Sequence, residues 1–243
     1  MNTFPTEIVT LPSKGMLYDP ESALAKGEIE MKYMTAKEED ILTNQNFIEK
    51  GIVLDKLMRS LIVTDIKYED LLIGDKNAIM IAARILSYGK DYTFTFMDQE
   101  YTVDLSEFTE KELHEEVERG VNNFEFTLPN SKVPITFKLL SHKDERKIEE
   151  EVRSMKRLKS NQSFLSTTRM KHTITSIDGT SDQKTIREFV DKDLLAMDAR
   201  ALRKHIEKIT PDMDLFFFPE RTDTPVNLPI TVQFFYPDFQ GRV

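Results

Sequence analysis

Residues 9–20 read VTLPSKGMLYDP, and residues 126–137 read FTLPNSKVPITF. Both stretches contain Thr-Leu-Pro followed closely by Ser and Lys. A phrase that occurs twice in 243 residues raises the question of an internal repeat. An internal repeat decides the architecture, so it has to be considered before any other pattern.

Further matches follow the shared phrase in the same order. EIEMKYMTAKEEDIL (28–42) aligns with PITFKLLSHKDERKI (134–148), and EDLLIGDKNAIMIAARI (69–85) aligns with KDLLAMDARALRKHI (192–206). Each copy then becomes aromatic, in DYTFTFMDQEYTVDL (91–105) and in DLFFFPERTDTPVNLPITVQFF (214–235). The order predicts two tandem units, 1–108 and 121–243, joined by a short connecting helix at 109–120. The second unit is longer, with a Ser/Thr-rich insertion near 160–183.

Helix-start signals occur at equivalent places in the two copies. A Ser or Thr followed three residues later by an acidic residue is a capping pattern, and it occurs at Thr35–Glu38, Ser141–Asp144 and, in the connecting segment, Thr109–Glu112. Asp75 and Asp198 begin the next apolar helical stretch in each copy, where a carboxylate can accept from free N–H groups. The signals predict helices in both units.

The aromatic stretches have the alternation of β-strands. Tyr92, Phe94 and Phe96 alternate with threonines, which predicts a β-hairpin that turns near residues 98–99. Residues 215–218 and 230–234 predict a second hairpin. Each unit is therefore expected to consist of a strand, helices and a β-hairpin, and the predicted fold class is α+β.

The composition excludes several classes of protein. The chain has no cysteine, which excludes disulfides and thiolate zinc sites. A net charge of −9 argues against nucleic-acid binding, because Lys and Arg supply most of the affinity for phosphates. No stretch approaches the roughly 18 apolar residues of a membrane span.

Residues typical of catalysis are scattered. The four histidines form no metal-binding pair, and His142 is expected to be solvated in the first turn of a helix. The eight glycines form no phosphate-binding loop. The adjacent pair Ser13 and Lys14 is expected to form a turn rather than a catalytic dyad, because neighbouring side chains in a loop diverge. We expect no enzyme activity, no metal and no cofactor.

The C-terminal aromatics are the most suggestive feature. In FFFPE and QFFYPDF, consecutive aromatics point to both faces of a hairpin. They are either buried between the two units or form an edge to which a partner protein docks. Aromatic and Met side chains are favoured at interface cores. The candidate partner-binding residues are those of the C-terminal hairpin and of the first LPSK loop: Phe217, Phe235, Tyr236, Phe239, Lys14, Met16 and Tyr18.

Several motifs together resemble a known family. TLPSKGMLYDP, EIEMKYMTAKEEDILTN, DLLIGDKNAIMIAARILSYG, VDL, FEFTLPNSK and DLLAMDARALRKHIEKITPDMDL make the chain similar to the baseplate hub and hub-assembly proteins of T4-type contractile-tailed phages. The resemblance covers residues 8–237, nearly the whole chain. Relatives often carry Cys-x-x-Cys at a hairpin tip, and the chain departs from them at residues 97–100 and 219–223. Zinc binding is therefore not carried over.

The resemblance implies a non-enzymatic late viral protein that binds other proteins of the baseplate hub. It would act in the cytoplasm of the host bacterium during tail assembly, or remain in the baseplate of the virion tail. An assembly factor would leave the finished particle, whereas a structural subunit would stay through a large interface. Acidity and mixed-charge helices favour the assembly factor. An alternative of another class is an α+β protein with a small-molecule pocket between the repeats.

Overall fold

The computed structural model describes residues 5–158, 164–219 and 224–236, and its fold class is α+β, as predicted. The first half of the chain contains these elements: β1 (Thr6–Thr10), η1 (Ala23–Lys26), β2 (Glu28–Lys32), α1 (Ala36–Leu42), α2 (Gln45–Glu49), α3 (Val53–Leu61), η2 (Tyr68–Asp70), α4 (Ile73–Tyr88), β3 (Asp91–Phe96), β4 (Gln99–Asp104) and η3 (Leu105–Glu107). The second half contains β5 (Phe124–Thr127), β6 (Pro134–Phe137), α5 (His142–Leu158), α6 (Leu165–Thr173), β7 (Ile174–Ile177), α7 (Gln183–Lys192), α8 (Ala196–Ile209), β8 (Phe216–Phe217), β9 (Val226–Asn227) and α9 (Val232–Phe235).

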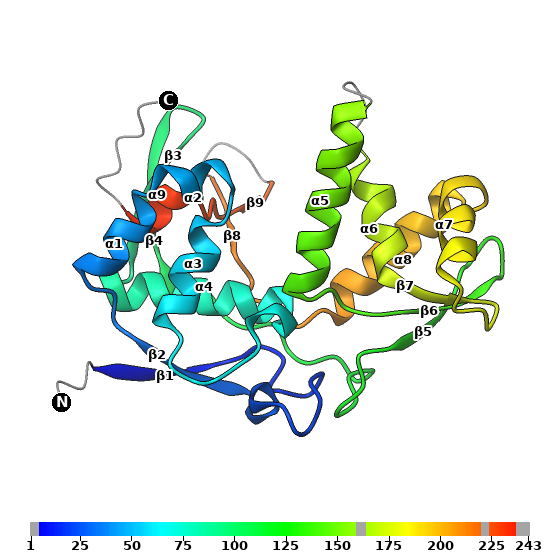
Figure 1. Ribbon diagram of the computed structural model, residues 1–243, viewed down its shortest axis with the longest axis horizontal. Helices are drawn as coiled ribbons and strands as arrows, with labels where there is room; N and C mark the ends of the chain where they lie inside the picture. Colours follow the sequence, from blue (N-terminus) through cyan, green and yellow to red (C-terminus); the bar gives the residue numbers. More distant parts are fainter. Residues whose placement is uncertain (1–4, 159–163, 220–223, 237–243) are drawn as a thin grey trace.

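The strands form small antiparallel sheets rather than one large sheet. β1 pairs with β2, β3 with β4, and β8 with β9, and the order β5-β6-β7 makes a three-stranded sheet. Figure 1 shows two groups of helices side by side along the long axis, α1–α4 in one half and α5–α8 in the other. The C-terminal elements β8, β9 and α9 lie with the first group.

The same polar motif begins the first helix of each half. Glu38 accepts from Thr35 and from Lys32, whose Nζ lies 2.8 Å from Oε1. Asp144 accepts from Ser141 and from Lys138, whose Nζ lies 2.7 Å from Oδ1. The capping patterns predicted at these two places are confirmed, and a lysine six residues before each carboxylate neutralises it.

The ends of α3 and α6 also correspond, and α6 lies in the segment where the sequence predicts an insertion. Ile62 follows the last residue of α3, donates its N–H to Met58 and bridges Met31 of β2. Ile174 likewise follows the last residue of α6, donates its N–H to Met170 and pairs with β6. Residues 164–183 are thus ordered as α6, β7 and a turn, and 160–163 lie outside the described residues. The correspondences agree with the interpretation of two related units, which stays a prediction.

The connecting helix predicted at 109–120 is wrong, because no helix forms there. The segment instead pairs with the chain near residue 213: Lys111 donates to Asp212 (2.8 Å), Asp214 donates to Thr109 (2.9 Å), and Glu110 bridges Met213. A helix this short needs an apolar face to be stable. Leu113 and Val117 alone supply little apolar surface.

The second predicted hairpin forms only in part. β8 and β9 pair over two residues each, and the predicted strand at 230–234 is replaced by the short helix α9. Pro225 and Pro229 lack the N–H that a longer ladder needs. Phe234 and Phe235 are both fully buried. In a strand with only one covered face, one of two consecutive side chains would be exposed, because they point to opposite faces.

The C-terminal segment completes the core of the first half. Phe217 packs edge-on against Phe94 at 4.8 Å between ring centroids, and Phe234 packs against Tyr92 at 4.7 Å. The Tyr92 hydroxyl donates to the carbonyl of Pro229 (3.0 Å). The boundary predicted at residue 120 therefore does not separate two bodies, since residues 214–219 and 224–236 pack with the first unit.

Candidate interaction surfaces

The LPSK loop (11–14) and its counterpart LPNSK (128–132), together called the two LPSK loops, are each fastened by a buried aspartate from the first turn of a helix. Asp75 of α4 accepts from the Ser13 N–H (2.9 Å) and hydroxyl (2.6 Å). Asp198 of α8 accepts from the N–H groups of Asn130 (2.8 Å) and Ser131 (3.0 Å). Both aspartates were predicted to cap their own helices. They instead join each helix to a loop more than 60 residues earlier in the chain.

The first LPSK loop therefore has a structural role. Tyr18 is buried, donates to Asp75 (2.6 Å) and accepts from the Leu72 N–H (2.9 Å). Burial, together with the charge of Asp75, raises the pKa of Tyr18. Lys14 pairs with Glu110, and Met16 is half-buried. Tyr18 is thus excluded from a docking surface, and Lys14 and Met16 contribute to holding the loop.

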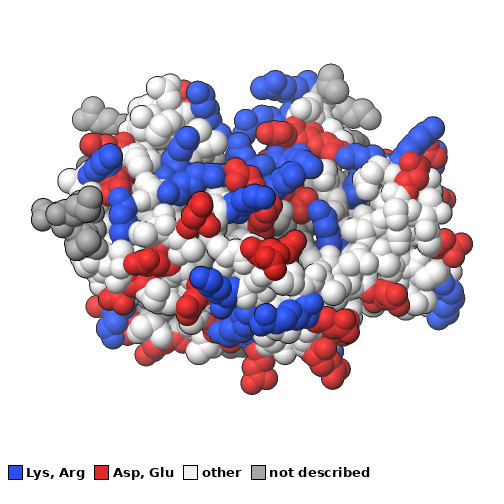
Figure 2. All heavy atoms as spheres, turned by 60° about the horizontal axis from the view of Figure 1, so that its bottom comes forward, with Lys and Arg blue, Asp and Glu red and all other residues white. Residues whose placement is uncertain are grey.

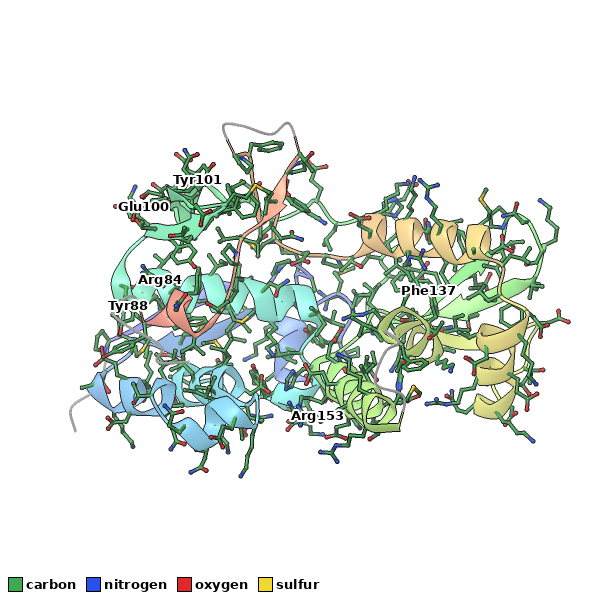
Figure 3. All side chains as sticks on the ribbon, turned by 90° about the horizontal axis from the view of Figure 1, so that it is seen from above. Arg84, Tyr88, Glu100, Tyr101, Phe137 and Arg153 are labelled. Atoms are coloured by element: carbon green, nitrogen blue, oxygen red, sulfur yellow. The ribbon has the colours of Figure 1, made fainter. Side chains whose placement is uncertain are left out.

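The aromatic residues predicted for docking lie mainly inside the molecule. Phe217 is only 6% exposed and Phe235 is fully buried. Both belong to the aromatic core between the C-terminal segment and the β3–β4 hairpin, and Figure 3 shows Tyr101 of that hairpin beside this segment. Tyr236 is half-buried, and Phe239 lies outside the described residues. Of the two interpretations, burial holds for Phe217 and Phe235.

The residues on either side of Phe217 face outward. Phe218 is 71% exposed and Phe216 is 37% exposed, as the alternation of a strand requires when Phe217 points inward. Together with Phe217 they border a hollow of about 520 Å³, whose other walls include Val103, Phe108 and Pro225. We call Phe216, Phe218 and the hollow the aromatic edge. Sequence analysis identified the segment but not which alternate residues are exposed.

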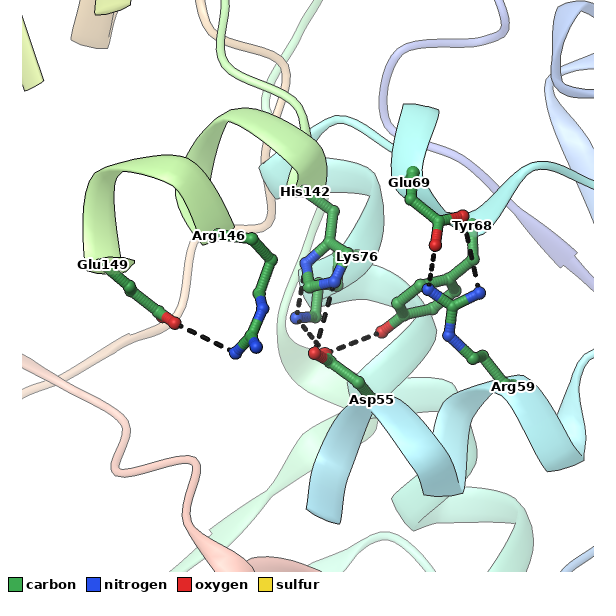
Figure 4. A network of polar contacts seen from close by, with 8 residues as sticks. All are labelled: Asp55, Arg59, Tyr68, Glu69, Lys76, His142, Arg146 and Glu149. Atoms are coloured by element: carbon green, nitrogen blue, oxygen red, sulfur yellow. Dashed lines mark hydrogen bonds and ion pairs between the residues drawn. The ribbon is translucent and has the colours of Figure 1, made fainter. Parts of the chain in front are cut away.

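A buried polar cluster joins the two halves of the molecule. Asp55 of α3 accepts from Lys76 of α4 (2.8 Å) and lies 3.2 Å from Nε2 of His142, the first residue of α5 (Figure 4). Tyr68 packs edge-on against the His142 ring at 4.9 Å. Burial acts to raise the pKa of Asp55, but His142 and Lys76 outweigh it and hold that pKa far below its usual value. His142, predicted to be solvated, is buried here.

Basic side chains line the groove above this cluster, between α3 and α5. The groove has a volume of about 550 Å³, and five cations line it: Lys56, Arg59, Lys143, Arg146 and Lys147. Arg59 is paired with Glu69 (2.7 Å), and Arg146 with Glu149 (3.2 Å), as Figure 4 shows. Asp55, Glu69 and Glu150 also line the groove, and Figure 2 shows Lys and Arg gathered in the upper middle of the face with Asp and Glu among them. The groove is therefore a mixed-charge surface.

A smaller hollow lies at the junction of the halves. The sequence analysis considered a small-molecule pocket at this place as an alternative. Its volume is about 260 Å³, and Leu72, Met170 and Ile206 form apolar walls. Two of its cations are already neutralised, Lys138 by Asp144 and Arg169 by Glu145. Ligand pockets are typically about 300–1,000 Å³. The hollow is below that size and carries no argument for a ligand.

The described part of the chain contains no group of three or more His, Asp or Glu side chains placed to hold a metal ion. None of its helices is long and apolar enough to cross a membrane. No known protein family matches the sequence, and neither a curated protein nor a solved structure matches the chain.

Proposed function

We propose that the chain is a non-enzymatic assembly protein of the tail baseplate of a T4-type contractile-tailed phage, which binds hub proteins while the hub is built. The motifs around the two LPSK loops and the two Asp-Leu-Leu helices support the proposal by their resemblance to that family. The structural observation that carries it is the aromatic edge, because it offers an apolar anchor for a partner protein on an otherwise well-packed segment.

The aromatic edge has the make-up of a protein-binding site. Large aromatic side chains beside a hollow are the usual anchors of an interface, and a polar rim around them excludes water. Glu107 and Asp214 line the hollow and form an acidic rim, and Asp104, which also lines it, is paired with Lys90 (2.6 Å). The partner surface would accordingly have an apolar centre and Lys or Arg at its margin.

The assembly role is preferred to that of a retained subunit. The net charge of −9 keeps a free chain soluble, as a factor that binds and leaves requires. The alternative, a structural subunit kept in the finished hub, needs a larger and more apolar interface. The assembly factor would act in the cytoplasm of the host bacterium, whereas the retained subunit would be part of the virion tail.

A pull-down with the hub proteins of the same phage tests the proposal. The double substitution Phe216→Ser/Phe218→Ser should weaken binding at least about tenfold, since anchor residues carry most of the binding energy. Leu165→Ser, which changes an exposed apolar residue of α6, is the matched control and should leave binding unchanged. Circular dichroism would verify that both variants fold. Equal binding by wild type and the double variant would contradict the assignment of the aromatic edge.

A further inference from the structure

The two halves of the molecule meet through a short backbone contact. Leu72 and Ser141 form an antiparallel bridge between the extended residues that precede α4 and α5. His142 donates to Leu71 (2.7 Å), and Ile73 donates to Leu140 (3.3 Å). The segment before α4 thus pairs with the segment before α5.

The chain contains a second version of both segments. In the sequence repeat, Leu71–Ile73 corresponds to Leu194–Ala196, and Leu140–His142 corresponds to Met34–Ala36. The backbones agree: Leu72 has φ −65° and ψ 150°, and Leu195 has φ −63° and ψ 142°. The capping motif described above begins within 34–36 and within 140–142, at Thr35 and at Ser141. We call residues 34–36 the α1 edge and residues 194–197 the α8 edge.

Neither edge has the partner that its counterpart has. Leu195 is 50% exposed and Met197 is 65% exposed, whereas Leu72 is buried. Within the described residues, the N–H groups of Ala36 and Ala196 donate to nothing, and the carbonyls of Met34 and Leu194 accept from nothing. These are the groups that correspond to the hydrogen-bonded atoms of the internal contact.

The two edges cannot meet within one chain. Figure 1 shows α1 at one end of the long axis and the start of α8, next to α7, at the other. Two copies of the chain can bring the edges together, because, within the described residues, the free N–H and carbonyl of the α1 edge match the free carbonyl and N–H of the α8 edge. Where the internal contact is polar, with His142 and Lys76, the corresponding residues are Ala36 and Ala199, so a contact between copies would be apolar and close.

We propose that the chain associates with itself head to tail, with the α1 edge of one copy pairing with the α8 edge of the next. Met34–Ala36 and Leu194–Ala196 form the antiparallel bridge, and Leu195 and Met197 are covered by the neighbouring copy. Such a contact joins unlike surfaces and therefore produces a ring or an open chain of subunits rather than a closed dimer. The inference goes beyond hub binding and does not depend on it.

Sedimentation velocity of the purified chain over a range of concentrations tests the inference. The wild type should rise from 28.3 kDa through integer multiples of that mass. Leu195→Asp disables the α8 edge, and Asp is favourable at this helix-cap position, so the fold is kept. Ala36→Pro disables the α1 edge, because Pro is tolerated in the first turn of a helix but has no N–H to donate.

Each variant alone should dissociate at least about tenfold more readily than the wild type. Mixed together, the two variants should form a one-to-one dimer and nothing larger, because one intact edge remains on each. Leu165→Asp is the control and should associate like the wild type. A wild type that stays at 28.3 kDa at every concentration, a variant that associates as the wild type does, or a mixture that forms no dimer would overturn the proposal.

Discussion

Asp75 and Asp198 occupy the same position in the first turns of α4 and α8, yet their carboxyl groups titrate differently. Burial raises the pKa of Asp75 even though Ser13 and Tyr18 donate to it. Burial acts in the same direction on Asp198, but the donors of Asn130 and Ser131 outweigh it and hold the pKa of Asp198 at about 2. The sequence located both residues but not their partners, since a contact across 60 or more residues leaves no local signal.

Replacement of Asp75 should show how much the loop contact contributes. Asp75→Ala leaves the buried Ser13 N–H and the Tyr18 hydroxyl without their acceptor. The free energy of unfolding should fall by roughly 2–4 kcal/mol, because each unsatisfied buried donor costs about 1–3 kcal/mol. Urea denaturation measures the change, and Asp193→Ala, at an exposed site, is the control. An Asp75→Ala variant as stable as the control would mean that the loop is held by other contacts.

Glu151 should make stability depend on pH in the acid range. Hydrogen bonds from Arg187, helped by His172, hold the pKa of Glu151 at about 2, below the usual 4.5. A carboxyl group whose pKa is lowered by folding stabilises the protein fully above pH 4.5, and that contribution is lost as the pH falls towards about 2.

Glu151→Gln should therefore lower the free energy of unfolding by roughly 1 kcal/mol at neutral pH, because solvent screens part of the ion pair. The difference from wild type should shrink as the pH falls from 4.5 towards about 2. Denaturation at several pH values measures it, with exposed Glu150→Gln as the control. A difference that stays constant over this range would show that Glu151 keeps its usual pKa in the folded protein.

At the scale of elements, local patterns predict the β3–β4 hairpin correctly but not the C-terminal segment. The β3–β4 hairpin was predicted from its alternation and is confirmed, with its turn at Met97 and Asp98. Residues 230–234 alternate apolar and polar side chains, which predicts a strand, but the segment is short enough to form a single turn of helix instead. The segment forms the helix α9, which packs against α4, and its Phe234 packs against Tyr92.

Neighbouring phenylalanines should respond very differently to replacement. Phe217→Ala removes a ring packed among Phe94, Phe96 and Tyr101, and should cost about 3–5 kcal/mol of unfolding free energy. Phe218→Ala removes an exposed ring and should stay within about 0.5 kcal/mol of wild type. Thermal and urea unfolding of the two variants measures the difference. Equal losses of unfolding free energy would show that Phe217 does not point inward and Phe218 outward.

At the scale of the whole molecule, the sequence predicts the fold class and the matching motifs, and it misses how the halves interlock. A strand pattern shows that one face is apolar without showing what covers it. The sequence therefore left undecided whether Phe217 and Phe235 belong to the core or to a docking site. It also could not predict that residues 214–219 and 224–236 pack against the first half. The exposed Phe216 and Phe218 follow from the alternation once Phe217 is known to point inward.

The assembly role is tested by mass spectrometry of two samples from infected cells: complexes captured on the chain during assembly, and purified finished tails. We predict that hub proteins are captured with the chain and that the chain is absent from finished tails. A fixed copy number in the tails would contradict the assembly-factor role in favour of a retained subunit. Capture of no hub protein, with no chain in the tails, would contradict the proposed function itself.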